Sequence, residues 1–103
     1  MTGANPYRGE ASLTVSGTAI VLRPSFAALV AAEGELGPLF ALVERAAEGK
    51  LGLGEIVALF DHVSTDRPET ITREVIGEAV VVQGLAGVTP VLRILLGQIL
   101  QGR

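Results

Sequence analysis

Cysteine and tryptophan are absent from this 103-residue chain, and it contains one histidine, one tyrosine and three phenylalanines. Without cysteine the protein can form no disulfide, no thiolate metal site and no cysteine nucleophile. A single histidine, His62, cannot form a metal site that needs several imidazoles, and we interpret it as a satisfied or exposed residue at a helix end. Because aromatic residues are scarce, the core must be built from Leu, Val, Ile and Ala, a mixture that suits closely packed helices.

Charge of either sign is also limited, with eight basic and eleven acidic side chains and a formal net charge of −3. No cluster of lysine and arginine could follow a phosphate backbone, which argues against nucleic acid as a partner. Asp61 and Asp66 flank His62 but are too few to complete a metal site, and the glutamates are spread over several segments. The glycines between Gly49 and Gly54 match neither a P-loop nor a dinucleotide-binding motif. We therefore expect no catalytic, metal-binding or cofactor-binding residue, no cofactor and no enzymatic activity.

Long uninterrupted apolar runs are missing as well. The most apolar tract, residues 88–100, is broken by Pro90, Arg93, Gly97 and Gln98. It is therefore shorter than the roughly 18 consecutive apolar residues that a membrane span requires. The N-terminus lacks the apolar core of a signal peptide. We expect no membrane partner and a cytoplasmic location, or association with a virion if the protein is structural.

Alternating polar and apolar residues near the N-terminus predict a β-hairpin. Residues 1–9 are Gly, Pro and polar, which is typical of a flexible arm. Apolar side chains alternate with polar ones over 11–15, Ser16-Gly17 can form a turn, and a β-branched run follows over 19–22. We predict a hairpin within residues 10–23.

Helical periodicity with start and stop signals fills residues 25–101. The predicted helices begin at Ser25, at Pro38, at Gly52 and at Thr70 or Thr72. Gly84 or Gly87 can end the fourth helix and begin the last one, which tolerates Pro90 only in its first turn. In the first of these helices Phe26, Leu29 and Val30 fall on one side, which makes it amphipathic.

For one segment of this helical part, the sequence does not decide between a helix and a strand. The run Val80-Val81-Val82 has strand propensity, so both a helix and a strand remain open there. We predict an α+β, helix-dominated fold, with an N-terminal β-hairpin followed by four to five short α-helices in a single domain over residues 10–103.

The last predicted helix has an unusually broad apolar face. It comprises Val91, Leu92, Leu95, Leu96, Ile99 and Leu100. Such width in a small domain can exceed what its own core needs, so the helix is either central to the core or shares part of its face with a partner. The residues predicted to contact a partner are Val81, Val82, Leu92 and Ile94, of which Ile94 lies outside the broad face.

Several short segments, spread over nearly the whole chain, carry a family resemblance. They are residues 4–10, Leu22-Arg23, residues 26–29, Leu36-Gly37, residues 39–47, residues 49–51 and residues 84–88. Their order and spacing resemble the small tail-assembly chaperones of gene transfer agents and of related long-tailed phages.

This resemblance implies a function in protein binding. Family members of this kind bind the tape-measure protein of a phage-like tail and shield its helices until tube subunits polymerise around them. The alternative is a structural tail tube or connector subunit. The expected partners are therefore the tape-measure protein or other tail proteins, and a homo-oligomer is one further option.

Overall fold

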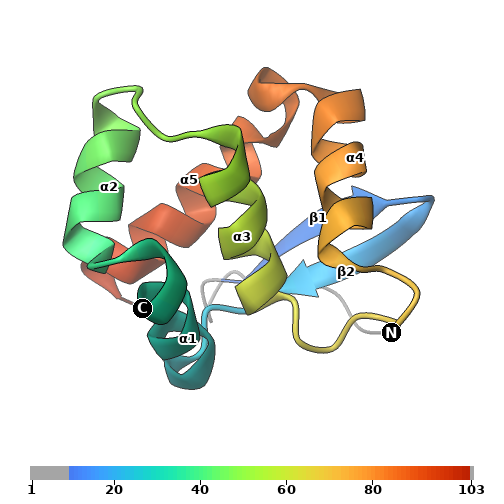
Figure 1. Cartoon of the computed structure of the whole chain (residues 1–103), viewed down its shortest axis with the longest axis horizontal. Helices are drawn as coiled ribbons and strands as arrows, with labels where there is room; N and C mark the ends of the chain where they lie inside the picture. Colours follow the sequence, from blue (N-terminus) through green and yellow to red (C-terminus); the bar gives the residue numbers. More distant parts are fainter. Residues whose placement is uncertain (1–9, 103) are drawn as a thin grey trace.

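The computed structural model describes residues 10–102, in which a two-stranded antiparallel sheet is followed by five helices (Figure 1). The strands are β1 (Ala11–Val15) and β2 (Thr18–Leu22). The helices are α1 (Phe26–Leu36), α2 (Leu39–Ala47), α3 (Leu53–Val63), α4 (Arg73–Gln83) and α5 (Leu85–Gln101). The predicted helix-dominated α+β class, with a hairpin before the helices, is confirmed. The flexible arm predicted over residues 1–9 lies outside the described residues.

The hairpin is closed by a two-residue turn of left-handed backbone. Ser16 has φ 51° and Gly17 has φ 77°, the geometry of a type I′ turn, whose twist matches that of the two strands. Val15 pairs with Thr18 and Ala11 with Leu22, with one-to-one pairing between them. Because side chains alternate along a strand, Leu13, Val15, Ile20 and Leu22 all point into the core while Ser12 and Thr14 face solvent.

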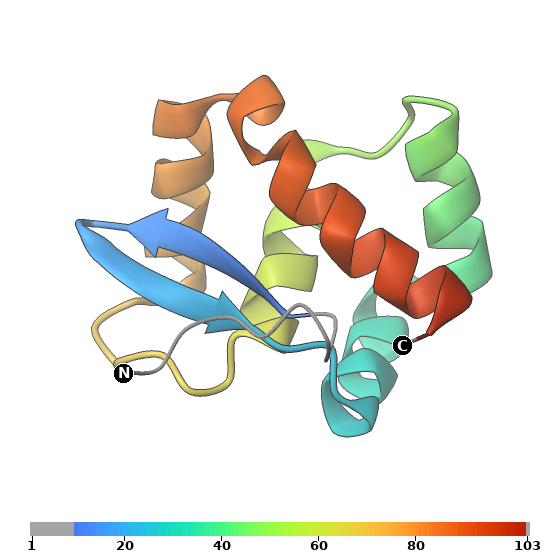
Figure 2. The same ribbon diagram turned by 180° about the vertical axis from the view of Figure 1, so that it is seen from behind.

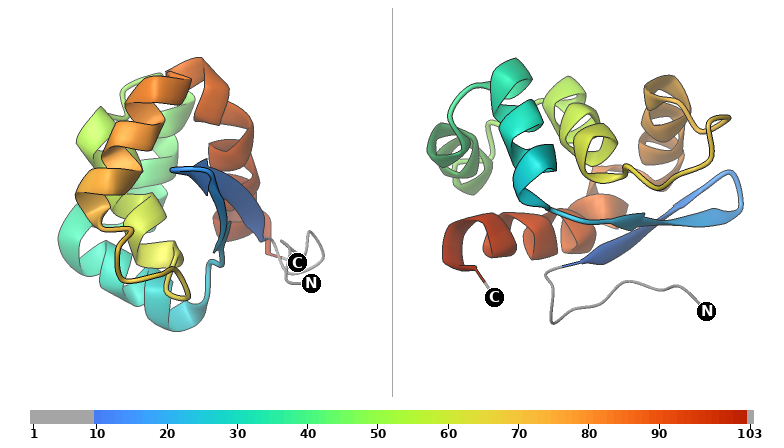
Figure 3. Two further views of the ribbon diagram at one scale, coloured as in Figure 1. Left: turned by 90° about the vertical axis from the view of Figure 1, so that its right-hand side faces the viewer. Right: turned by 90° about the horizontal axis from the view of Figure 1, so that it is seen from below.

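The elements form two layers around one apolar core. Figure 3 shows the hairpin and α5 in one layer and helices α1, α3 and α4 in the other. Helix α3 is the most deeply buried, because its residues 56–60 and Val63 are all inaccessible or nearly so. Phe60 is the largest of the fully buried side chains, and it anchors a core otherwise made of aliphatic residues.

Helix α1 buries a different side from the one that its largest residues suggest. Phe26 and Val30, expected on the apolar side of this helix, are both exposed, while Leu29 is half-buried. The buried residues are Ala28 and Ala32, one helical turn apart. Small side chains let the backbone of α1 approach α3 closely, so packing distance decides which face turns inward.

The helix boundaries follow the expected signals closely. Ser25 caps α1 by accepting a hydrogen bond from the Ala28 N–H at 3.2 Å. Gly37, with φ 86°, ends α1, and α2 begins just after Pro38. Of the two threonines proposed for the start of α4, it is Thr72 that accepts from the N–H of Val75.

The segment 80–82, left open between helix and strand, is helical and belongs to α4. Val80 is buried, and its carbonyl accepts from the N–H of Gly84, which ends the helix. The segment pairs with neither strand of the hairpin, and its backbone is bonded within the helix.

Helix α5 begins directly after Gly84, one of the two glycines predicted to start it. Pro90 was expected in its first turn, yet the helix starts at Leu85, which places the proline in the second turn. Its missing N–H leaves the carbonyl of Ala86 without the usual partner, and both residues are exposed, so water can satisfy that carbonyl. The first turn is set at an angle to the rest of the helix (Figure 2).

Within residues 10–102 no single helix is long and apolar enough to cross a membrane. The pairs α1 with α2 and α4 with α5 reach that length only as bent pairs, with angles of 74° and 119° between the helices.

Candidate functional site

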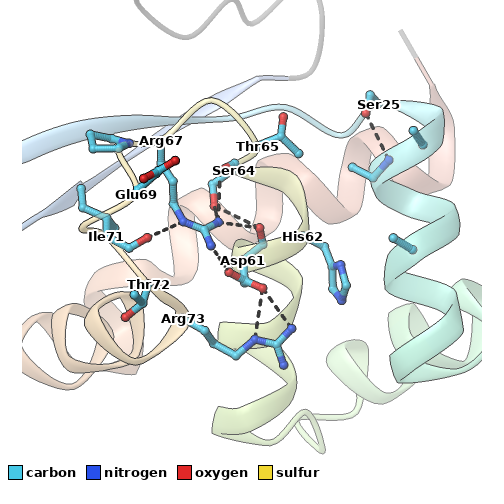
Figure 4. Close-up of a pocket in the computed structure, with 14 residues that line it drawn as sticks. Ser25, Asp61, His62, Ser64, Thr65, Arg67, Glu69, Ile71, Thr72 and Arg73 are labelled. Atoms are coloured by element: carbon cyan, nitrogen blue, oxygen red, sulfur yellow. Dashed lines mark hydrogen bonds and ion pairs between the residues drawn. The ribbon is translucent and has the colours of Figure 1, made fainter.

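A polar cleft of about 820 Å³ lies between α1, the C-terminal end of α3, the loop 64–72 and the first turn of α4 (Figure 4). The titratable side chains that reach it include Asp61 and His62 from α3 and Arg73 from the next helix, α4. Arg67 enters from the loop. Figure 4 shows Asp61 between the two guanidinium groups.

Asp61 is the centre of this polar cluster. Arg73 donates from Nε and Nη2 to Asp61 Oδ2, at 3.1 and 3.0 Å, and Arg67 donates to Asp61 Oδ1. The Asp61 side chain is largely buried, and a buried carboxylate is tolerated only when it is paired and hydrogen-bonded. The two arginines therefore satisfy this carboxylate and leave little of it for a ligand.

Glu35, at the end of α1, extends the cluster. Arg73 binds it with two parallel hydrogen bonds of 2.6 and 2.8 Å, and His62 Nε2 lies 2.7 Å from its Oε1. The hydrogen bonds from Arg73, with a smaller effect from His62, lower the pKa of Glu35 from its ordinary value of 4.5 to about 2. Hydrogen bonds to Glu35 and then Asp61 raise the pKa of Arg73.

Arg67 fastens the loop between α3 and α4. Its Nη1 donates to the carbonyls of Asp61 and Ser64 at 2.9 and 3.1 Å and to the Ser64 hydroxyl at 2.8 Å. Its Nε donates to the carbonyl of Ile71. The Asp61 carbonyl, at the end of α3, also accepts from the N–H and hydroxyl of Ser64, whereas the carbonyls of Ser64 and Ile71 lie in the loop, outside regular secondary structure. One guanidinium thus replaces the missing backbone hydrogen bonds.

The cluster offers little chemistry to a substrate. The Ser64 hydroxyl donates to the Asp61 carbonyl at 3.2 Å, so it is not paired with His62 as a nucleophile would be with its base. In residues 10–102 no group of three His, Cys, Asp or Glu side chains could hold a metal ion. The charged groups satisfy one another, and we interpret the cluster as a clamp that holds α1, α3 and α4 together.

The surface carries apolar side chains that the core does not use. A groove of about 270 Å³, which we call the α2–α5 groove, runs between α2 and the C-terminal end of α5. It is lined by Glu33, Pro38, Leu39, Phe40, Val43, Ile99 and Leu100. Phe40 is 75% exposed and Leu100 is half exposed, so the groove presents an aromatic ring and aliphatic side chains to solvent.

A second hollow of about 630 Å³, the hairpin–α4 groove, lies between the hairpin turn and the outer side of α4. Its lining residues are Thr14, Ser16, Gly17, Val75, Glu78, Ala79, Val82 and Gln83. Val82 is 83% exposed. The two grooves lie at opposite ends of the long axis, with α2 at one end and the hairpin turn at the other (Figure 1).

The four residues predicted to contact a partner lie on different faces. Val81 and Val82 are 62% and 83% exposed but, as consecutive helical residues, they point about 100° apart, and only Val82 lines a groove. Ile94 is 47% exposed on the outer side of α5, whereas Leu92 is half-buried against the core. Of the four, only Val82 lines one of the two grooves, and the role of all four stays a prediction.

Sequence reasoning overlooked Phe40. It sits beside Leu39 and Leu42 in α2 but off the buried stripe of that helix, in which only Leu42 is fully buried. An aromatic residue outside the apolar period of an amphipathic helix was the available signal. Glu35 was also missed as a partner of Arg73 and His62, because nothing in the spacing of these residues indicates that α1 meets α3 and α4 there.

A family model described as phage tail tube protein, GTA-gp10, matches residues 8–102. Comparison with curated proteins gave no match, and neither did comparison with solved structures. The matched region includes the polar cleft and both grooves.

Proposed function

The chain belongs to the family described as phage tail tube protein, GTA-gp10, and from this membership we propose that it is a tail-assembly chaperone for the tape-measure protein. In this function the protein binds apolar stripes on the helices of its client and is displaced as the tube forms around them. A long helix-rich protein needs such cover, because its apolar stripes aggregate while its assembly partners are missing. We propose no chemical reaction.

The observation that carries the proposal is the α2–α5 groove. A helix binds in a groove through apolar anchors at successive turns, and aromatic residues at the centre of an interface contribute most to affinity. In the α2–α5 groove, α2 contributes the exposed Phe40 and α5 contributes the exposed Leu100. Glu33 at the rim supplies a carboxylate that can pair with a basic residue beside the apolar stripe of the client.

The hairpin–α4 groove, to which Val82 belongs, gives a second surface for the same client. Val82 lines the hairpin–α4 groove, and Val81 and Ile94 are exposed elsewhere on α4 and α5. Leu92 packs against the core and would take part only through its exposed edge. We rank this surface second because it contains no aromatic residue.

Co-expression with the tape-measure protein from the same source tests the proposal. We expect the two to co-purify and the larger protein to become soluble. Phe40→Glu should lower affinity by roughly tenfold or more, because it places a charge on the central anchor. The matched control is Phe26→Glu: Phe26 is 86% exposed on α1 and lies outside both grooves, so this variant should bind as the unaltered protein does.

The two surfaces are separated by the same assay. If Val82→Glu or Ile94→Glu abolishes binding while Phe40→Glu does not, the client contacts that residue selected from the sequence and not the α2–α5 groove. If no variant and no wild-type preparation binds the tape-measure protein, the chaperone function is wrong.

A structural tail tube subunit is the second candidate. The family description itself names the tail tube, and two apolar grooves at opposite ends of the chain suit the head-to-tail contacts from which rings are built. Electron microscopy of the concentrated protein distinguishes the two: rings or tubes favour the subunit, whereas small particles favour the chaperone.

A further inference from the structure

The two outer edges of the hairpin differ in how they are covered. Helices α4 and α5 pack against β1, and the Gln83 side-chain amide donates to the carbonyl of Thr14 at 2.8 Å. Strand β2 has no comparable helix contact within the described residues. One edge of the sheet is thus closed by the fold, and the other is open.

The geometry of the turn identifies the backbone groups that point outward from β2. In a two-residue hairpin the residues that flank the turn, Val15 and Thr18, exchange hydrogen bonds, and the pattern alternates from there. The N–H and C=O groups of Ala19 and Val21 therefore point away from β1.

Two hydrogen bonds agree with this alternation. The Thr14 carbonyl points outward from β1 to Gln83, and on β2 the Arg23 N–H points outward to the Val63 carbonyl at 2.7 Å. Arg23 follows Val21 by two residues, so the backbone groups of both residues point away from β1. In residues 10–102 no partner accepts or donates to the backbone groups of Ala19 or Val21.

Strand β2 also lacks the features that protect an exposed edge. Soluble proteins guard such edges with charged residues, prolines or bulges. The strand Thr18–Leu22 contains no charged residue and no proline, and its pairing with β1 has no bulge. Ala19 is exposed and Val21 half-buried, so the edge is reachable from solvent.

We propose that a second copy of this chain pairs with the open edge of β2 through a twofold axis at Ile20. Antiparallel pairing about this axis places Ala19 opposite Val21 of the second copy, and each N–H then meets a C=O. The backbone groups of Ala19 and Val21 point outward and lie on either side of Ile20, so this edge can pair with the same edge of a second copy. A twofold contact uses the same edge on both copies and closes at a dimer with a four-stranded sheet.

A second copy fits this edge better than a longer foreign strand does. The open stretch is bounded by the turn on one side and by the Arg23 to Val63 hydrogen bond on the other. A foreign strand would gain no more hydrogen bonds than the second copy supplies. Because so few bonds form, we expect a dissociation constant on the order of 0.1 to 1 mM.

Sedimentation equilibrium from micromolar to millimolar protein tests the dimer with two charge variants. Ala19→Lys/Val21→Lys places like charges opposite each other in the proposed register, whereas Ala19→Lys/Val21→Glu places opposite charges there. Both side chains lie on the solvent face, so both variants should fold, which circular dichroism checks. We expect the wild type and the Lys/Glu variant to dimerise and the Lys/Lys variant to stay monomeric.

Cross-linking gives a second readout that does not depend on charge. The chain has no cysteine, so Ala19→Cys and Val21→Cys each introduce a single thiol. After oxidation of an equal mixture, the mixed dimer should dominate over either homodimer, because only the mixed pair lies directly opposite. A monomeric wild type at every concentration, equal association of both charge variants, or equal yields of all cross-linked species would each overturn the proposal. Loss of tape-measure binding alone would leave it standing.

Discussion

At the scale of single residues, Arg67 does most to order the loop between α3 and α4. We expect Arg67→Met to lower the free energy of unfolding by about 2 kcal/mol, because several carbonyls lose a charged donor while partly buried. Urea denaturation measures the change. Arg93→Met is the matched control, since Arg93 is exposed on α5 and should shift stability by less than about 0.5 kcal/mol. Equal effects from the two variants would contradict the role of Arg67 in ordering the loop.

Glu35 makes the stability of the protein depend on pH. Its pKa is lowered from 4.5 to about 2 in the folded chain, so its contribution is fully present above the unfolded value near 4.5. That contribution is lost as the pH falls toward 2, because protonation breaks the pairing with Arg73. We expect Glu35→Gln to flatten the decline of stability between these two values, as measured by denaturant titration at each pH.

The control for this experiment is Glu48→Gln. Glu48 is exposed at the end of α2 and has no ion pair within the described chain. The stability of Glu48→Gln should therefore depend on pH in the same way as that of the wild type. If Glu35→Gln and the wild type decline in parallel, the ion pair with Arg73 contributes nothing to folding.

At the scale of elements, the contact between α1 and α3 depends on small side chains. Ala32 is fully buried, and we expect Ala32→Leu to cost about 1–3 kcal/mol, because the added methyl groups force the two helices apart. Ala31→Leu, on the exposed side of the same helix, should change the free energy of unfolding by less than about 0.5 kcal/mol. Thermal and urea denaturation of the two variants measure the difference in stability. A neutral Ala32→Leu variant would show that α1 is loosely packed.

Helix boundaries were the most predictable part of the elements. Ser25, the Gly37-Pro38 pair and Thr72 act through local backbone chemistry, and each begins or ends a helix where the sequence indicated. Pro90 was misplaced because the sequence does not reveal whether a carbonyl one turn earlier will face solvent. That depends on how α5 sits against the rest of the fold.

At the scale of the whole molecule, the family match confirms the resemblance to gene transfer agent and phage tail proteins that the sequence indicated. A chaperone leaves the complex before the tail is complete. We therefore expect quantitative mass spectrometry of purified particles to find this chain absent or far below the amount of the tube subunits. A copy number equal to that of a tube ring component would instead assign it to the tube.

Local chemistry and periodicity in the sequence were enough to determine the hairpin and the order of the helices, and the resemblance of several segments indicated the family. The turn at Ser16-Gly17 and the helix caps need only neighbouring residues, so they were readable from the chain. Which surfaces remain open was decided by the tertiary structure. Burial depends on which helices meet: Ala32 turned inward while Phe26 and Phe40 stayed outside, and Glu35 joined Asp61 through Arg73. The open edge of β2 has the same origin, because α4 and α5 pack mainly against β1.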